Sequence, residues 1–399
     1  MRVLYLTNKP IFPLVDGGCV AMHQFLKCLL NAGYNVKNFT ISTPKHPFEI
    51  NKYPSKLSTI IQPEGYYIDT RLSAINAAKS LLINSSYNID RFHSIELEKI
   101  IIDYINKNEC EIVIMESIFF AHYVKQIKKK CNVKVLLRSH NVEHEIWEKL
   151  ATNESNPLKK IYLNKLAKNL KKVELSTLPQ FDGVFCISKL DKNKFKSYLP
   201  NINYATIPLT IDRSQINSDY SIQRFFHIGS MNWKPNIESV NLLINDIFPK
   251  IRNLLPDAEL ILAGSNMPKE IESNTAKGIK VLGYIEDLSS FMASNGIMIV
   301  PLKSGSGVRV KLLEGLSLGV PIVTTSQGAE GIESTLSDST KRTMIIEDEI
   351  ENIIAASVNL FQNQELRSEL GENGKKLIQS KYQIEPVTNK IIEFIKHIS

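Results

Sequence analysis

The chain has 399 residues, of which 43% are hydrophobic and 22% are charged, and its formal net charge is +7. This ordinary globular balance excludes a disordered, collagen-like or coiled-coil protein and predicts two or three domains. No apolar run reaches the roughly 20 residues that span a bilayer, the first residues lack a secretory signal and the five cysteines lack metal-binding spacing, so we expect a cytoplasmic protein.

Short β-branched runs alternate with helical patterns in two successive series. The first series contains five predicted strands, at residues 3–7, 36–41, 112–115, 133–137 and 184–187. The second series contains six, at residues 225–228, 260–263, 280–282, 297–300, 322–324 and 344–346. Continuous apolar strands followed by amphipathic helices are typical of parallel sheets covered on both faces. We therefore predict an α/β protein with two doubly wound domains.

The segment 200–223 lacks a regular pattern and is the predicted linker, and a final helix is predicted over 384–398. These features predict an N-terminal domain over 1–212, a C-terminal domain over 213–380 and a terminal segment over 381–399. Ligands of open α/β sheets bind beyond the carboxyl ends of the strands. Binding residues are therefore expected in the loops at these ends, lining a cleft between the two domains.

Gly17 and Gly18 follow the first strand and precede a predicted helix over residues 19–30. Paired glycines let a ligand approach the backbone, and a helix N-terminus attracts anions. A simple turn explains the same pair equally well. The chain lacks the glycine patterns of Rossmann dinucleotide sites and of P-loops, which argues against a nicotinamide dehydrogenase or a P-loop NTPase.

His140 follows the strand at residues 133–137, within a polar cluster that runs from Arg138 to His144. A histidine at the end of a buried strand can polarise or hydrogen-bond a reacting group. A structural histidine with satisfied hydrogen bonds is the alternative, and this residue alone does not decide between the two.

The positive charge is concentrated between Leu158 and Lys196, where ten lysines stand against three acidic residues, an excess equal to the net charge of the whole chain. Within this segment, Ile161, Leu166 and Leu170 recur among lysines as in an amphipathic helix. Such a helix can lie on an anionic membrane, and a solvated surface is the alternative. Nucleic acid is disfavoured because the cations are lysines rather than arginines and no nucleic-acid-binding motif is present.

Two loops of the second series have the pattern of an anion site. After its first strand, Gly229, Ser230 and Lys234 place a glycine and a candidate diphosphate cation before a helix. After its fourth strand, the Ser-Gly-Ser-Gly stretch 304–307 offers main-chain amides that can wrap a diphosphate. Arg309 is expected in the first turn of the next helix, where a cation is unfavourable unless an anion is bound nearby.

Glu314 lies about two turns along the same predicted helix. Helical side chains lean toward the N-terminus, and a carboxylate accepts two hydrogen bonds from vicinal ribose hydroxyls. Phosphate at the helix start and ribose further along would suit a nucleoside diphosphate. The alternative is an ordinary surface loop with an ion pair between Lys311 and Glu314, three residues apart.

Short motifs follow one another in a specific order and spacing along nearly the whole chain. They are Asp16-Gly17-Gly18, Ser139 to Glu143, Phe185 to Ser188, Gly229 to Asn236, Leu262 to Gly264, Leu282 to Asp287 and Gly305 to Gly319. In these motifs the chain resembles GT-B fold glycosyltransferases of the large retaining family 4. The similarity is greatest to bacterial members that build capsule, lipopolysaccharide or exopolysaccharide.

The resemblance implies transfer of a sugar, with retention, from a UDP- or GDP-sugar to a glycan or polyprenyl-linked acceptor. It implies a reaction without metal or cofactor, in which the leaving phosphate takes the acceptor proton. It also implies a terminal helix that packs back on the N-terminal domain. A membrane-linked acceptor would fit peripheral association with the inner face of the plasma membrane through Lys159–Lys172.

The resemblance also assigns roles to individual residues. His140 would lie near the transferred sugar, Glu314 would bind the ribose, and Arg309 and Lys234 would face the diphosphate. The other residues implied in donor binding are Gly17, Gly18, Gly229, Ser230, Gly283, Tyr284, Ser306, Gly307 and Val308. The residues implied on the sugar face are Gln327, Gly328 and Glu330.

The chain departs from the family pattern at several positions. Ser306 stands where the E-x7-E motif begins with glutamate, Asn141 replaces the aspartate that often follows the histidine, and Ser230 or Met231 replaces the arginine of the donor loop. Of the Asn-Gly-Asp usual after the linker strand, Asp212 alone is kept. Three other functions stay open: a nucleotide-sugar epimerase or hydrolase of the same fold, a two-domain solute-binding protein and a non-catalytic relative.

Overall fold

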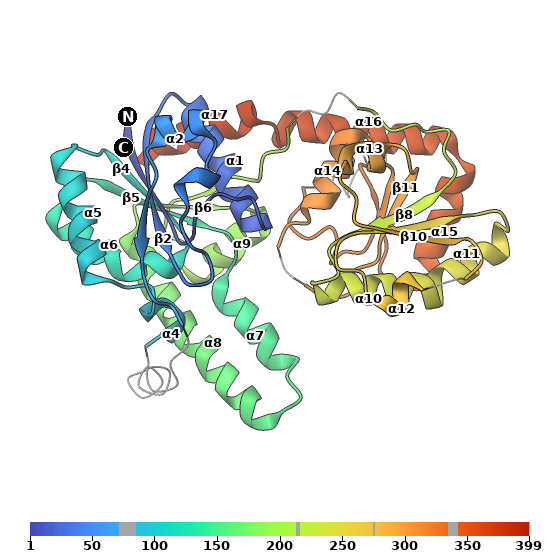
Figure 1. Cartoon of the computed structure of the whole chain (residues 1–399), viewed down its shortest axis with the longest axis horizontal. Helices are drawn as coiled ribbons and strands as arrows, with labels where there is room; N and C mark the ends of the chain where they lie inside the picture. The colour runs from blue at the N-terminus through green and yellow to red at the C-terminus, as the bar shows by residue number, and fades with distance from the viewer. Residues whose placement is uncertain (72–84, 213–215, 274–275, 306, 334–341, 399) are drawn as a thin grey trace. The chain divides into compact units, whose positions relative to one another are not determined.

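The computed structural model describes residues 1–71, 85–212, 216–273, 276–305, 307–333 and 342–398. The chain forms two compact units. Unit 1 comprises Met1–Thr210 and Ile384–Ser399, and unit 2 comprises Ile211–Gln383. Each unit is built around one parallel sheet covered by helices, as the alternation of strands and helices predicts (Figure 1).

The sheet of unit 1 has seven parallel strands in the order β3-β2-β1-β4-β5-β6-β7. Their bounds are β1 Arg2–Thr7, β2 Asn35–Ser42, β3 Glu64–Tyr67, β4 Ile112–Glu116, β5 Lys134–Ser139, β6 Gly183–Cys186 and β7 Tyr204–Thr206. The order reverses between β1 and β4, which makes the ends of these strands the switch point where such sheets bind ligands. Along β1, Leu4 and Leu6 join one core cluster, whereas Val3 and Tyr5 join the cluster on the other face.

Helices cover both faces of this sheet. Their bounds are α1 Gly17–Asn31, α2 Ser55–Ile61, α4 Tyr87–Asp90, α5 Ile95–Lys107, α6 Ala121–Lys130, α7 Glu143–Thr152, α8 Pro157–Thr177, α9 Lys189–Tyr198 and α17 Ile384–Ile398. Val387, Ile391 and Ile395 of α17 recur every four residues and join the core cluster of α1. The terminal helix therefore packs back on unit 1, as expected.

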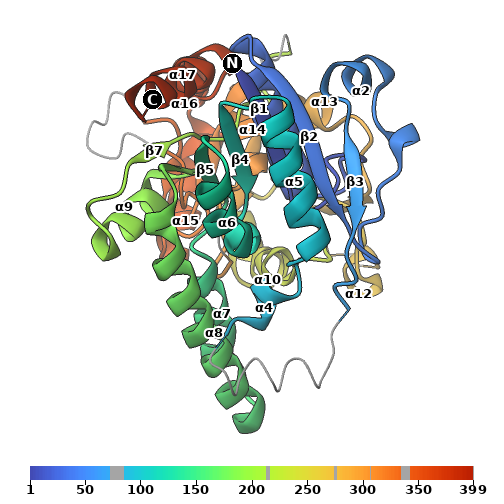
Figure 2. The ribbon, with the colours of Figure 1, turned by 90° about the vertical axis from the view of Figure 1, so that its left-hand side faces the viewer.

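Helices α7 and α8 form a hairpin that projects from the rest of unit 1 (Figures 1 and 2). Glu174 of α8 fixes the start of α7, because its carboxylate accepts hydrogen bonds from the main-chain N–H groups of Glu143 (3.1 Å) and His144 (3.2 Å) and from Nδ1 of His144 (2.5 Å). A carboxylate there satisfies free N–H groups and suits the helix dipole. Burial, and then the charge of Glu174, raise the pKa of Glu143 to about 8.

The sheet of unit 2 has six parallel strands in the order β10-β9-β8-β11-β12-β13. The strands are β8 Phe225–Ile228, β9 Leu260–Ala263, β10 Ile279–Gly283, β11 Ile297–Val300, β12 Ile322–Thr324 and β13 Ile345–Ile346. The helices are α10 Lys234–Leu242, α11 Phe248–Leu254, α12 Lys269–Glu272, α13 Leu288–Ala293, α14 Val310–Leu318, α15 Ile350–Gln362 and α16 Gln364–Lys381. Across the described residues of both units, no helix has the length and apolar character needed to span a membrane.

Two edge strands lie outside the sequence prediction. No strand is expected at β3, and β7 lies within the segment 200–223, which is predicted as a linker. Both strands are at the ends of the sheet, β3 is mostly exposed and β7 is half-buried. Neither therefore has the continuous apolar run that reveals a central strand. The linker prediction is wrong at residues 204–206, which complete the sheet of unit 1.

Candidate functional site

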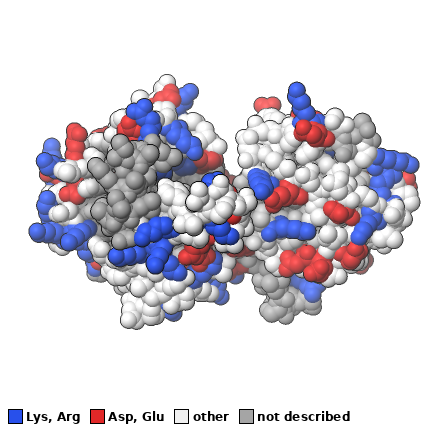
Figure 3. All heavy atoms as spheres, turned by 90° about the horizontal axis from the view of Figure 1, so that it is seen from below, with Lys and Arg blue, Asp and Glu red and all other residues white. Residues whose placement is uncertain are grey.

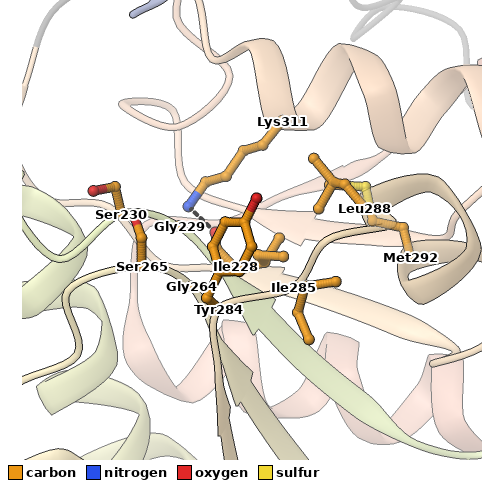
Figure 4. Close-up of a pocket in the computed structure, with 10 residues that line it drawn as sticks. All are labelled: Ile228, Gly229, Ser230, Gly264, Ser265, Tyr284, Ile285, Leu288, Met292 and Lys311. Atoms are coloured by element: carbon orange, nitrogen blue, oxygen red, sulfur yellow. Dashed lines mark hydrogen bonds between the residues drawn. The ribbon is translucent and has the colours of Figure 1, made fainter. Parts of the chain in front are cut away.

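A pocket opens at the carboxyl ends of β8, β9 and β10 in unit 2, where sheets of this type bind ligands (Figure 4). Its volume is about 190 Å³. The residues that line it are Ile228, Gly229, Ser230, Gly264, Ser265, Tyr284, Ile285, Leu288, Met292 and Lys311. The structure thus brings together three residues expected in a donor site, Gly229 and Ser230 from the loop after β8 and Tyr284 from the loop after β10.

One wall of the pocket depends on the close approach of three loops. Gly264 has a φ of +142°, and a Cβ there would lie 1.8 Å from the carbonyl oxygen of Gly229. The N–H of Gly264 also donates to the carbonyl oxygen of Gly283 (2.6 Å). Any side chain at position 264 would push the loop after β8 away, so glycine is required for this wall.

Lys311 of α14 places a cation in the pocket. Its Nζ donates to the carbonyl oxygen of Ile228 (2.8 Å; Figure 4). It also donates to Oδ1 of Asn236 (3.0 Å). Asn236 in turn donates to the carbonyl oxygen of Ser230 (2.9 Å), so the ammonium is held against the loop after β8. Burial, and then the charge of Arg309, lower the pKa of Lys311 to about 7. Because these acceptors are neutral, the charge favours an anion in the pocket.

Arg309 is the N-cap of α14, one residue before the first turn in which the sequence places it. Its Cζ lies 5.0 Å from the ring centroid of Trp233, and Nη1 donates to the carbonyl oxygen of Gly307 (2.7 Å). Burial lowers the pKa of Arg309. These protein contacts account for a cation at the helix start, so the position of Arg309 does not by itself require a bound anion.

Glu314 lies on the same helix, three residues after Lys311. Its carboxyl group is partly buried, and burial raises its pKa. Over the described residues, the carboxylate has no hydrogen-bond or ion-pair partner, and the expected alternative pair with Lys311 does not form. A carboxylate removed from water in this way suits the hydroxyl donors of a ligand.

The loop after β12 carries the residues expected on the sugar face. Nε2 of Gln327 donates to the carbonyl oxygen of Gly305 (3.0 Å) and to Oε2 of Glu330 (2.9 Å). These bonds join the loop after β12 to the loop after β11. A Cβ at Gly328 would lie 2.1 Å from Oγ1 of Thr324, so this glycine is needed for packing within the loop.

Among the described residues, the others expected at the diphosphate do not line the pocket. Lys234 is 86% exposed, pairs with Glu238 (3.7 Å) and does not line the pocket. Val308 packs against the apolar core of unit 2, and Gly307 has a φ of +86°. Ser306 lies outside the described residues.

In unit 1, Gly17 and Gly18 begin α1, and Asp16 is its N-cap. Asp16 accepts a hydrogen bond from the N–H of Cys19 (2.9 Å) and pairs with Lys9 (2.6 Å). Burial opposes ionisation of Asp16, but the hydrogen bonds from Lys9 and Cys19 outweigh it and lower its pKa to about 2. A Cβ at Gly17 would meet no atom within 4 Å, so a ligand can approach the backbone there.

His140 belongs to a buried charged cluster at the carboxyl ends of β4 and β5. Its Nε2 contacts Oε2 of Glu116, and Arg138 donates to both carboxylate oxygens of Glu116 (2.8 and 3.0 Å). The hydroxyl of Tyr5 donates to the same carboxylate. Burial opposes ionisation of Glu116, but the charges of Arg138 and His140 outweigh it and lower its pKa to about 2.

This cluster defines the state of the His140 ring. An ionised carboxylate only accepts hydrogen bonds, so Nε2 of His140 carries a proton and Nδ1 is the other ring nitrogen, left for a ligand. The side chain is 21% exposed, whereas that of Glu116 is fully buried. Glu116 is not among the residues expected from the sequence, although a polar residue directly after an apolar strand is the same signal that identifies His140. In the described part of the chain, no three His, Cys, Asp or Glu side chains are placed to hold a metal ion.

Comparisons with known proteins agree with this geometry. Residues 222–363 match the family model described as glycosyl transferases group 1. Over 98% of its length, the chain is 25% identical to an uncharacterised 44.6 kDa protein in the cps region of Klebsiella pneumoniae, of which 99% is covered.

Solved structures show the same fold over the whole chain. Sucrose-phosphate synthase from Thermosynechococcus elongatus has a TM-score of 0.67 and 13% identity, covering 100% of this chain and 99% of that chain. HepE from Anabaena, in complex with UDP and glucose, has a TM-score of 0.60 and 10% identity, covering 99% of each chain.

Two doubly wound parallel-sheet units of this kind, matched over their full length by these structures, define the GT-B fold. The family match falls on unit 2, which contains the pocket at β8, β9 and β10. The chain therefore has the GT-B fold, and its second unit is similar to group 1 glycosyl transferases.

Proposed function

We propose that this protein is a glycosyltransferase that binds a UDP- or GDP-sugar in the pocket of unit 2 and transfers the sugar to a glycan or lipid-linked glycan. One observation carries the proposal: the buried ammonium of Lys311 lies in the pocket among neutral acceptors, on the helix that also carries the partly buried Glu314. The likeness to HepE, solved with UDP and glucose, supports a UDP-sugar. The relative in the cps region supports a role in bacterial surface polysaccharide synthesis.

Lys311 and the N-terminus of α14 would bind the diphosphate, with Arg309 close to them at the N-cap. Positive charge fixed at this place stabilises the negative charge that grows on the diphosphate as its bond to the sugar breaks. Glu314 would accept hydrogen bonds from the ribose hydroxyls, and Tyr284 would lie beside the base. Gln327 and Glu330 would contact the sugar.

The proposed reaction exchanges one bond at the anomeric carbon for another. The bond to the diphosphate oxygen breaks, and a bond to the acceptor oxygen forms on the same face, so the configuration is retained. The proton of the acceptor hydroxyl passes to the departing phosphate oxygen. Because Lys311 and Arg309 provide fixed positive charge, we include a reaction independent of divalent cations in the proposal.

We also propose that the reaction takes place in the cytoplasm. All five cysteines lie in the described part of the chain as buried thiols that form no disulfide. Cysteines kept as thiols in a protein of this size are typical of a reducing compartment. A lipid-linked acceptor would then be reached at the inner face of the plasma membrane.

A donor panel tests the proposed function. The purified protein is incubated with UDP-glucose, UDP-galactose, UDP-N-acetylglucosamine and GDP-mannose, and both the unfolding midpoint and the released nucleotide are measured. Donors of one base are expected to raise the midpoint, because ligand binds the folded state alone, and nucleotide release should survive EDTA. A midpoint unchanged by every donor would contradict the donor site, and an epimerised donor formed without acceptor would identify the epimerase alternative.

Replacing Glu314 by alanine should weaken UDP binding about tenfold or more, since a charge-assisted hydrogen bond to ribose is lost. Binding of inorganic pyrophosphate should not change, because it has no ribose. Isothermal titration with both ligands measures the difference. Glu286→Ala removes an exposed carboxylate near the pocket and serves as the control. Equal weakening of pyrophosphate and UDP would show that Glu314 does not contact ribose.

The affinity for UDP-glucose is expected to fall as pH rises above about 7, the pKa of Lys311 in the free protein. The anion prefers the protonated ammonium, so binding takes up a proton and weakens by up to about tenfold per pH unit above that value. UDP-glucose is the suitable ligand because its diphosphate does not titrate between about pH 6 and 8.5. Lys311→Arg, which stays charged, should give a flat profile, and an equally steep profile in this variant would assign the proton to another group.

A further inference from the structure

The end of the α7–α8 hairpin exposes apolar side chains. Leu158 is 80% exposed, Ile161 67% and Tyr162 39%, and Leu150 at the end of α7 is 50% exposed. Leu158, Ile161 and Tyr162 are spaced i, i+3 and i+4, so they share one face of α8. Because α7 ends at Thr152 and α8 begins at Pro157, these residues lie at the end of the hairpin that projects from the rest of unit 1 (Figures 1 and 2).

These exposed residues are separate from the part of α8 that packs in unit 1. The buried side chains of α8 include Leu166, Leu170 and Glu174, which lie further along the helix than the exposed residues 158, 161 and 162. Leu170 belongs to the core, and Glu174 binds the start of α7. The apolar residues at the tip belong to neither of the core clusters of unit 1, and exposed apolar side chains gathered in this way are typical of an interaction site.

Lysines continue the exposed face behind the apolar tip. Lys168 and Lys172 are exposed and Lys165 is half-buried, and they follow Leu158 at ten, fourteen and seven residues, which keeps them on the same side of the helix. Lys159 and Lys171, on other faces of α8, pair with Glu154 (2.6 Å) and Glu148 (3.8 Å). Seen from the side toward which the hairpin projects, unit 1 shows Lys and Arg side chains next to uncharged surface (Figure 3).

We propose that the tip of the α7–α8 hairpin docks on an anionic lipid bilayer. Leu158, Ile161 and Tyr162 enter the boundary between headgroups and acyl chains, and Lys165, Lys168 and Lys172 lie at the level of the phosphates. This order of apolar tip and cationic stem matches the order of layers in a bilayer. A nucleic acid could bind the lysines, but its charged backbone offers no apolar environment for the side chains at the tip. The inference is independent of the donor pocket, because the two features lie in different units.

Vesicle sedimentation without nucleotide tests the proposal. The wild-type protein is expected to bind phosphatidylcholine vesicles that contain phosphatidylglycerol, to bind pure phosphatidylcholine vesicles at least about tenfold more weakly, and to be released by high salt. Absence of binding to the anionic vesicles at low salt would overturn the proposal. So would equally tight binding of a DNA or RNA oligonucleotide that depends on the same lysines.

Two matched variants separate the apolar and the cationic contributions. The triple variant Leu158→Ser, Ile161→Ser, Tyr162→Ser should weaken binding to anionic vesicles about tenfold or more. The triple variant K165Q, K168Q, K172Q should remove the preference for anionic lipid. As the charge-matched control, K269Q, K277Q, K303Q changes exposed lysines of unit 2 and should bind like wild type. Equal loss in the control would show non-specific attraction and overturn the assignment to the hairpin.

Insertion of the tip has its own spectroscopic readout. Tyr162→Trp places a fluorophore on the apolar face, and its emission should shift to the blue with anionic vesicles and not with soluble polyanions. The thermal midpoint without vesicles should equal that of wild type, because the site is exposed. If wild type instead forms dimers that the Leu158→Ser variant lacks, and vesicles leave the emission of the Tyr162→Trp variant unchanged, the apolar tip is a contact between copies and the proposal fails.

Discussion

Replacing Lys311 by methionine is expected to weaken UDP binding by about two orders of magnitude. The substitution removes the ammonium that lies in the pocket and also leaves Oδ1 of Asn236 and the carbonyl oxygen of Ile228 without their donor. Truncating a buried, hydrogen-bonded charge that meets an opposite charge typically costs about 2–5 kcal/mol of binding free energy. Isothermal titration of UDP measures the loss.

Two further variants make this result specific. Lys303→Met removes an exposed lysine from the loop after β11 and should leave UDP binding unchanged. Lys311→Arg keeps the charge and should retain most of the affinity. Since the unpaired acceptors also affect folding, the free energy of unfolding is measured for each variant without ligand. Normal UDP affinity in a folded Lys311→Met protein would exclude the proposed diphosphate site.

Replacing Glu116 by glutamine is expected to lower the rate of sugar transfer about 100-fold or more, with UDP affinity unchanged. Glu116 holds His140 through Nε2, and a neutral amide, which can donate as well as accept, does not fix the proton on Nε2. The donor pocket lies in unit 2 and is not touched. Steady-state transfer rates and UDP titration on the same preparation measure the split between turnover and binding.

Folding must be measured in parallel, because Glu116→Gln leaves Arg138 buried without its carboxylate. Breaking a buried ion pair in this way typically lowers the free energy of unfolding by about 3–5 kcal/mol. His140→Ala provides the control, since it should lose the same activity and leave the Arg138 pair intact. The double variant should be no slower than either single variant. An active, folded Glu116→Gln protein would reduce the cluster to a structural role.

The carboxylate of Glu116 also affects how the free energy of unfolding depends on pH in acid. The pKa of Glu116 in the folded state is about 2, below its ordinary value. A depressed pKa contributes stability that is complete above the unfolded-state value and is lost as pH falls toward the folded-state value. Glu116→Gln should therefore show a shallower loss of stability with acid than wild type between about pH 5 and 2.

The central strands could be predicted from the sequence because they are buried on both faces. β9 and β11 are unbroken apolar runs, β8 and β12 each contain a single polar residue (His227 and Thr324), and the observed bounds of all four match the predicted ones. Edge strands lack this signal, since one side of the backbone and much of the side-chain surface face solvent. A three-residue edge strand such as β7 has too little pattern for periodicity to detect.

The candidate site could be predicted only in part from the sequence, because its key contacts depend on strand register. Glu116 and Arg138 are 22 residues apart in the chain but are direct partners in the pairing of β4 with β5. Lys311 reaches Asn236, 75 residues away, across the ends of two strands. Glycines such as Gly229 and Gly264 indicate by their residue type that two backbone segments lie close together. A lysine in the sequence gives no indication of which acceptor it will contact. Local motifs thus located the loops, and the sheets decided which side chains meet.

The packing of α17 against α1 has a consequence for how the protein is made. Val387, Ile391 and Ile395 complete a hydrophobic cluster whose other members are translated before the whole of unit 2. During synthesis, part of the apolar surface of α1 therefore stays exposed until residue 398 has left the ribosome. This surface includes Met22, Phe25 and Leu26. Chaperone engagement of nascent chains should persist for about as long as unit 2 takes to be translated, at roughly 5–20 residues per second. A stop codon after residue 383 should yield aggregated protein even though unit 2 is encoded in full.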